Sequence, residues 1–173
     1  MARSIDTGTD TLTAEVDDHG VAVLTMNRPE RRNAMTDDML DGLAIALRDV
    51  ETAADVRCVV LTGAGGAFCA GGDVKGFAEG GGAGSTAGTS WDEGVHQQRL
   101  SHRETAGALF SMPKPTLAAI GGAAAGAGLS LALACDMRIA LDSAVMTTAF
   151  ARVGLAGDYG GTWFLTQLVG PAK

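Results

Sequence analysis

Cysteine is scarce in this 173-residue chain, and its three cysteines form no CxxC pair. Cys58 and Cys135 lie in apolar runs, where a buried free thiol is more common than a metal ligand. Such cysteine use favours a reducing compartment, so we predict a cytoplasmic location. Residues 1–10 lack the apolar core of a secretory signal, and no apolar run is long enough to cross a membrane. We therefore expect a soluble protein that has no membrane partner.

Basic residues are also fewer than acidic residues. The chain has 13 Lys and Arg against 20 Asp and Glu, which gives a net charge of −7 and a pI near 4.8. This balance argues against a general nucleic-acid-binding protein. No Gly-Lys dipeptide and no GxGxxG pattern occur, so the Walker A loop and the dinucleotide fingerprint are both missing. The three histidines show no metal-ligand spacing with acids or cysteines, and we predict no metal site.

One near match to a hydrolase motif also lacks its partner. The segment from Gly128 to Ala132 resembles the nucleophile elbow GxSxG, with Ser130 in the position of the nucleophile. That triad needs an acid and then a histidine after the serine, and no histidine follows Ser130. The sequence therefore disfavours Ser130 as a hydrolase nucleophile.

What the sequence does contain is a repeated plan of strand, glycine-rich turn and helix. Val59–Thr62 and Thr116–Ile120 are apolar and suit strands buried on both faces. Small-residue turns follow at 63–72 and 121–128, and the second turn leads into an apolar helix candidate, 129–135. Either turn alone could serve packing only. Together they could point backbone N–H groups at one shared oxygen and form an oxyanion hole.

The rest of the chain alternates between strand and helix patterns. This alternation predicts one α/β domain over residues 1–173 with a mainly parallel sheet. Residues up to about Asp10 are expected to be frayed, and the glycine-rich segment 79–89 is expected to be a flexible loop. The helix opened by the capping box at Ser90 carries His96, His102, Arg103 and Glu104, which we expect on a solvated face. Further strands are predicted at 12–17, 21–26, 137–140 and 145–148, and further helices at 37–53, at a short stretch from Asp73 and at 162–169.

Four segments in this order resemble the crotonase family of enoyl-CoA hydratases and isomerases. They are NRPERRNAM at 27–35, LTGAGGAFCAGGDVK at 61–75, the stretch from Pro113 to Ala140, and GLAGDYGGT at 154–162. The resemblance implies a crotonase-like spiral of ββα repeats, a coenzyme A thioester as substrate with no separate cofactor, and assembly into homotrimers or pairs of trimers. It also implies the oxyanion donors Gly72 and Ala127. The CoA contacts that it implies are Arg28, Arg32, Ala34, Ala70, Asp73 and Val74.

The chain departs from the hydratase pattern of this family. Ser130 and Phe150 stand where hydratases carry glutamates, and neither can move a proton at neutral pH. Alanine replaces the usual glycine at 127, which an N–H donor tolerates. The sequence ends at Lys173, before the C-terminal helices that usually complete the CoA site, so that helical part is expected to be absent from this chain.

Asp158 is the remaining candidate for proton transfer. It lies in the glycine loop 154–161, and the resemblance implies that an aspartate here faces the acyl group in ring-enoyl isomerases. Tyr159 and Trp163 could give it apolar cover and raise its pKa. The structural alternative is a turn aspartate that caps the following helix. The favoured function is enoyl-CoA isomerisation. The alternatives are a hydratase, an acyl-CoA hydrolase or dehalogenase with Asp158 as nucleophile, and a non-catalytic acyl-CoA-binding or assembly subunit.

Overall fold

The computed structural model describes residues 2–73 and 90–172. Val74, the expected flexible segment 79–89 and most of the short helix expected from Asp73 lie outside the described residues. The elements in chain order are β1 (Arg3–Ile5), β2 (Leu12–Val16), β3 (Val21–Met26), α1 (Asp37–Thr52), β4 (Cys58–Gly63), α3 (Trp91–His102), a π-helical turn (Arg103–Gly107), α4 (Ala108–Ser111), β5 (Thr116–Ile120), β6 (Ala124–Ala125), α5 (Ala127–Ala134), β7 (Met137–Ala140), β8 (Met146–Thr147) and α6 (Gly161–Val169), with short 3-10 turns at Pro29–Arg31, Ala64–Gly66 and Ala149–Val153.

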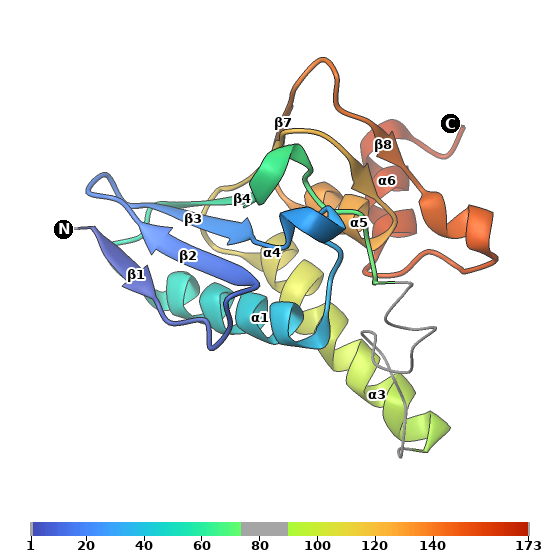
Figure 1. The fold of residues 1–173 in the computed structure, drawn as a ribbon, viewed down its shortest axis with the longest axis horizontal. Helices are drawn as coiled ribbons and strands as arrows, with labels where there is room; N and C mark the ends of the chain where they lie inside the picture. The colour runs from blue at the N-terminus through green and yellow to red at the C-terminus, as the bar shows by residue number, and fades with distance from the viewer. Residues whose placement is uncertain (1, 74–89, 173) are drawn as a thin grey trace.

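A six-stranded sheet in the order β1-β2-β3-β4-β5-β7 forms the centre of the fold (Figure 1). The first two pairings are antiparallel, and the pairings from β3 to β7 are parallel. The mainly parallel sheet expected from the sequence is therefore confirmed. Because β3, β4 and β5 run in the same direction, the segments that follow them leave the sheet at one edge, where ligands of such sheets usually bind.

One face of the sheet is covered by helix α1, which packs on β2 and β3 (Figure 1). Buried residues alternate with more exposed ones along both strands, as a half-covered sheet requires. The apolar residues of α1 recur at helical spacing and are buried on the same side, among them Leu43, Leu47 and Val50. Part of the core therefore lies between α1 and the sheet, and the same buried cluster continues to Leu131 of α5 and Phe164 of α6.

Residues Arg3–Ile5 form a strand, contrary to the frayed segment that we expected. Arg3 pairs with Val16 in an antiparallel ladder, and Ile5 is buried in the core. The Arg3 guanidinium also bonds to the carboxylates of Asp49 and Asp55, at 2.7 and 2.8 Å. The polar composition of this segment concealed these long-range partners, which only the folded chain brings together.

The helical stretch between Ser90 and Ser111 is confirmed, with an irregularity in its middle. Ser90 Oγ accepts a hydrogen bond from the Glu93 backbone N–H at 3.3 Å, as a helix cap should. The helix continues from α3 through the π-helical turn into α4 and ends at Ser111, with Met112 as its C-cap before the prolines. π-helical turns often occur at functional sites.

Candidate active site

The loop after β3 is tied to the turn after β4 by one buried side chain. Asn33 is fully buried and has a positive φ of 57°. Its Nδ2 donates to the carbonyl oxygens of Ala64 and Ala67, both at 2.9 Å. Its Oδ1 accepts from the backbone N–H of Arg28 at 2.9 Å. Asn33 therefore holds the arginine-bearing loop against the first glycine turn.

Several of the expected CoA contacts meet in this loop. Arg28 forms an ion pair with Asp73 at 3.1 Å, and its Nη1 donates to the Ala34 carbonyl at 2.6 Å. The Ala70 N–H donates to the carbonyl of Arg32 at 2.9 Å, and the Arg32 side chain is exposed. The structure thus brings five of the six residues into one neighbourhood. Their role in CoA binding stays a prediction.

The first expected oxyanion donor lies in a short parallel bridge between Met35 and Gly72. The Met35 N–H donates to the Gly71 carbonyl at 2.8 Å, and the Asp73 N–H donates to the Met35 carbonyl at 3.2 Å. In this pattern the flanking residues supply the bonds, so the Gly72 N–H points away from Met35. It is left available for an acceptor on the other side.

The second expected donor is the first residue of α5. The first α5 bond runs from the Ser130 N–H to the Gly126 carbonyl at 3.1 Å, so the helix itself offers no acceptor to the Ala127 N–H. Gly71 joins the two turns: its φ is +93°, and a Cβ there would lie 2.9 Å from the Ala125 oxygen and 3.5 Å from the Ala127 nitrogen. The two expected donors therefore belong to turns that touch.

The cysteine in the first turn, Cys69, is not a suitable nucleophile. Cys69 is fully buried, and its Sγ donates to the Asn33 carbonyl at 3.0 Å. Burial raises the pKa of the Cys69 thiol to about 12. The thiol therefore stays protonated at neutral pH and serves the packing of the turn.

Asp158 lies half-buried in the loop before α6. Its Oδ1 atom is buried and has no hydrogen-bond partner within residues 2–73 and 90–172, and burial raises the pKa of the carboxyl group. The N-cap of α6 is Gly160 and receives no side-chain bond, while the Gly161 N–H donates to the backbone carbonyl of Asp158 at 3.0 Å. The side chain of Asp158 therefore does not cap the helix, which removes the structural alternative raised by the sequence.

The two residues expected to give Asp158 apolar cover differ in burial. Tyr159 is buried, and its φ of 49° is unusual for a residue other than glycine. Trp163 is 52% exposed and packs its ring against Phe110 and Phe164 instead. Trp163 lies in the first turn of α6, and its indole belongs to an aromatic cluster with Phe110 and Phe164.

The Asp158 loop packs against the first turn of α5. A Cβ on Gly157 would lie 3.2 Å from the Phe150 ring, and the same ring would lie 3.7 Å from a Cβ on Gly126. A Cβ on Gly161 would lie 2.2 Å from Ser130 Oγ, so a larger residue there would displace the Ser130 side chain. The loop therefore lies beside the helix start that carries Ala127.

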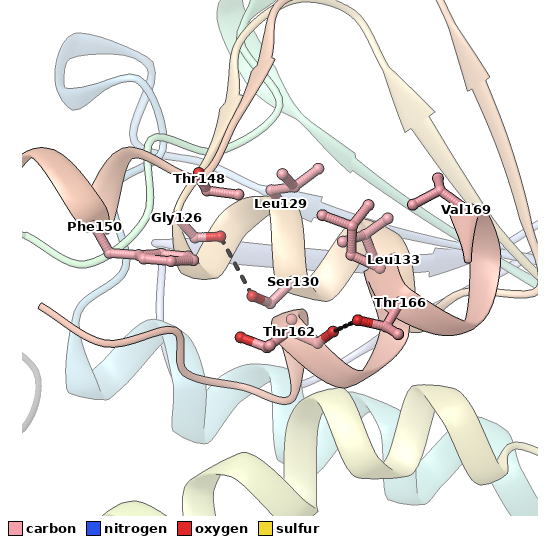
Figure 2. A pocket seen from close by; sticks show the side chains of 11 residues that line it. Gly126, Leu129, Ser130, Leu133, Thr148, Phe150, Thr162, Thr166 and Val169 are labelled. Carbon is pink, nitrogen blue, oxygen red and sulfur yellow. Dashed lines mark hydrogen bonds between the residues drawn. The ribbon is translucent and has the colours of Figure 1, made fainter. Parts of the chain in front are cut away.

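A cavity of about 240 Å³ lies between α5 and α6, with Ser130 and Phe150 in its wall (Figure 2). The Ser130 hydroxyl donates to the Gly126 carbonyl at 3.4 Å, and Thr166 Oγ1 donates to the Thr162 carbonyl at 2.8 Å. The other lining side chains are mainly aliphatic: Leu129, Leu133, Leu165 and Val169. The lining suits an apolar group, as ligand cavities usually do.

One polar side chain of α3 is more buried than the sequence predicted. His102 was expected on a solvated face, but it is half-buried, with its ring centroid 4.0 Å from that of Tyr159. Burial lowers its pKa, which favours the neutral imidazole. The signal lay in the spacing, because His102 precedes the buried Ala106 and Leu109 at helical intervals.

No group of His, Cys, Asp and Glu in the described part of the chain could hold a metal ion. Among the same residues, no helix is long and apolar enough to cross a membrane.

Comparison with known proteins decides the family. The model of the enoyl-CoA hydratase/isomerase family matches residues 17–173. The chain belongs to this family. A solved structure of an enoyl-CoA hydratase from Polaromonas sp. JS666 superposes with a TM-score of 0.80 at 33% identity, covering 93% of this chain and 60% of that one. The enoyl-CoA hydratase, or crotonase, fold expected from the resemblance is therefore confirmed.

Relatives within the enoyl-CoA hydratase/isomerase family are named both as isomerases and as hydratases. The chain is 42% identical over 154 residues to 1,2-epoxyphenylacetyl-CoA isomerase of Escherichia coli K12, which covers 89% of this chain and 56% of that protein. It is 44% identical over 162 residues to "Probable enoyl-CoA hydratase EchA14" of Mycobacterium tuberculosis H37Rv, covering 94% of this chain and 59% of that protein. The chain thus spans less than two thirds of the length of either relative.

Proposed function

We propose that the protein isomerises the double bond of an enoyl-CoA thioester, with Asp158 as the acid and base. The observation that carries this proposal is the buried Oδ1 atom of Asp158, which has no partner in the described structure and caps no helix. Burial raises the pKa of the Asp158 carboxyl group, which makes its carboxylate a stronger base than an exposed one. Ser130 and Phe150 offer no competing carboxylate at the positions of the hydratase glutamates.

The proposed reaction moves one proton between two carbons. The Asp158 carboxylate removes a proton from the carbon next to the thioester of a 3-enoyl-CoA, and the electron pair moves onto the thioester oxygen. The resulting dienolate then takes the proton back from the Asp158 carboxylic acid at the far end of the conjugated system. The product is the 2-enoyl-CoA, and Asp158 ends as the carboxylate in which it began.

The developing negative charge needs donors on the thioester oxygen. We assign these to the N–H groups of Gly72 and Ala127, because the first points away from its bridge partner and the second begins a helix. Loss of one such donor typically raises a barrier by about 3 kcal/mol. The N-terminal end of α5 adds partial positive charge in the same place.

The substrate also carries a coenzyme A moiety, for which we propose the loop 27–35 and the turn from Ala70 to Asp73. Arg28 is engaged by Asp73 and the Ala34 carbonyl, so it orients the loop. Arg32 is exposed and remains the better candidate for a phosphate contact. Assembly into trimers and a cytoplasmic location stay predictions from the resemblance and from cysteine use.

A panel of 3-enoyl-CoA thioesters tests the proposed reaction on the protein. We expect conversion to 2-enoyl-CoA, and in deuterium oxide we expect exchange of the proton next to the thioester. Formation of 3-hydroxyacyl-CoA from 2-enoyl-CoA as the main activity would favour a hydratase, and release of free acid would favour a nucleophilic Asp158. Binding without any turnover would favour a non-catalytic acyl-CoA-binding subunit.

A further inference from the structure

Buried polar atoms without partners are concentrated in one place. Within the described residues, the buried side-chain oxygen and nitrogen atoms that lack a hydrogen bond are Ser101 Oγ, His102 Nε2 and Asp158 Oδ1. Each unsatisfied buried polar group destabilises a protein, so native structures keep few of them. Three together indicate a place that is completed by something else.

The three atoms belong to two segments in direct contact. Ser101 and His102 end α3, and the His102 ring packs on Tyr159, the residue that follows Asp158. The Ser101 hydroxyl lies close enough to the Tyr159 phenol to oppose the rise of its pKa, but it does not reach hydrogen-bond geometry. One aromatic contact therefore holds the three polar groups in a common neighbourhood.

This neighbourhood adjoins the first glycine turn. Burial raises the pKa of Tyr159 to about 12, and Asp158, Asp37 and Cys69 act in the same direction because they lie near the phenol. Cys69 belongs to the turn itself, where its Sγ accepts from the Gly71 N–H at 3.4 Å. Tyr159 is therefore close both to the Ser101–His102 pair and to the first glycine turn.

The chemistry of the pair selects its partner. The lowered pKa of His102 keeps the imidazole neutral, and a hydroxyl is neutral as well. Both groups can donate or accept one hydrogen bond. An anionic partner would meet the carboxyl group of Asp158 nearby, whereas an uncharged oxygen would satisfy the pair without repulsion.

We propose that Ser101 and His102 form a polar subsite for an uncharged oxygen on the acyl group. The preferred substrate is then an oxygenated acyl-CoA, one that carries a hydroxyl, carbonyl or epoxide oxygen, rather than a hydrocarbon enoyl-CoA. This inference rests on the proposed function in one respect, because both require this site to bind an acyl-CoA.

Matched saturated ligands test the subsite without any turnover. The affinities of cyclohexylacetyl-CoA and its 2-, 3- and 4-hydroxy derivatives are measured by titration calorimetry. At least one hydroxylated ligand should bind roughly 2- to 10-fold more tightly than the parent, the worth of one hydrogen bond. Equal affinity of all four ligands would overturn the proposal and would indicate that the three atoms are satisfied by water.

Two variants and one control identify the residues involved. His102→Phe keeps a ring against Tyr159 but removes the nitrogen atoms, and Ser101→Ala removes only the hydroxyl. Each should reduce the preference for the hydroxylated ligand while the parent binds as before. His96→Phe, at an exposed position of the same helix, should leave the preference unchanged. A preference that persists in both variants would contradict the assignment.

The outcomes separate this inference from the proposed function. Equal binding of the four ligands together with turnover of 3-enoyl-CoA would defeat the subsite alone. A clear preference for a hydroxylated ligand without turnover of any 3-enoyl-CoA would defeat the isomerase proposal alone.

Discussion

The backbone N–H of Gly161 donates to the carbonyl oxygen of Asp158 at 3.0 Å, and the carboxylate of Asp158 takes no part in the start of α6. The loop is therefore closed by main chain, and its one acidic side chain is left for another use. A carboxyl group buried without a partner is unfavourable for folding, which gives the first prediction.

Asp158→Asn should stabilise the protein at neutral pH. Burial raises the folded-state pKa of Asp158 above its unfolded value. The protonated form is therefore the one that the fold favours, and its contribution is present at low pH and lost as pH rises through the folded pKa. Thermal unfolding of both proteins should give a higher Tm for the variant at pH 7.5 and a smaller difference at pH 4. A constant difference at both pH values would count against a buried, partnerless carboxylate.

Gly71→Ala should disrupt the contact between the two turns. The new Cβ would lie 2.9 Å from the Ala125 oxygen in a backbone with φ of +93°. Gly66→Ala is the matched control, because Gly66 has φ of +85° and open space around it. Urea unfolding should show that Gly71→Ala is less stable than the control by about 1–3 kcal/mol. Equal stability would mean that the turns do not approach as closely as described.

Asn33→Ala should loosen the loop that bears the arginines. It removes the donor to the carbonyls of Ala64 and Ala67 and leaves them without that partner in a buried place. We expect a loss of about 1–3 kcal/mol in the free energy of unfolding, together with weaker CoA binding. Gln97→Ala, at an exposed position of α3, is the control. Unchanged CoA affinity in Asn33→Ala would separate the loop from the CoA site.

Arg32→Gln should weaken CoA binding mainly at low salt. The guanidinium is exposed, so an attraction to phosphate would be screened as ionic strength rises. Arg57→Gln is the control, because Arg57 precedes β4 at the opposite edge of the sheet. Titration with CoA at low and high salt measures both variants. If Arg32→Gln binds CoA as the wild type does at both salt concentrations, the phosphate contact is not made by Arg32.

The sequence predicted the sheet and most helices because apolar periodicity is a local signal. The two glycine turns were also predictable from a local signal, because glycine is the residue that most readily adopts a positive φ. Gly71 and Gly126 both have a positive φ. Contacts between residues far apart in the chain could not be predicted from the sequence. The partners of Arg3 and the ion pair of Arg28 with Asp73 join residues more than 40 positions apart. The ring contact between His102 and Tyr159 is also long-range, although the helical spacing of His102 from the buried Ala106 and Leu109 was a local signal of its burial.

The central claim is that Asp158 transfers the proton. Asp158→Asn keeps the size of the side chain and removes the base, so turnover of 3-enoyl-CoA should fall by roughly 10²- to 10⁴-fold, while the Kd for a saturated acyl-CoA stays near that of the wild type. Ser130→Ala is the control in the adjacent cavity wall and should retain activity. The measurement is kcat of Asp158→Asn with the best 3-enoyl-CoA, beside its acyl-CoA affinity. Lost turnover with retained binding is the predicted result, and wild-type turnover in the variant would contradict the account.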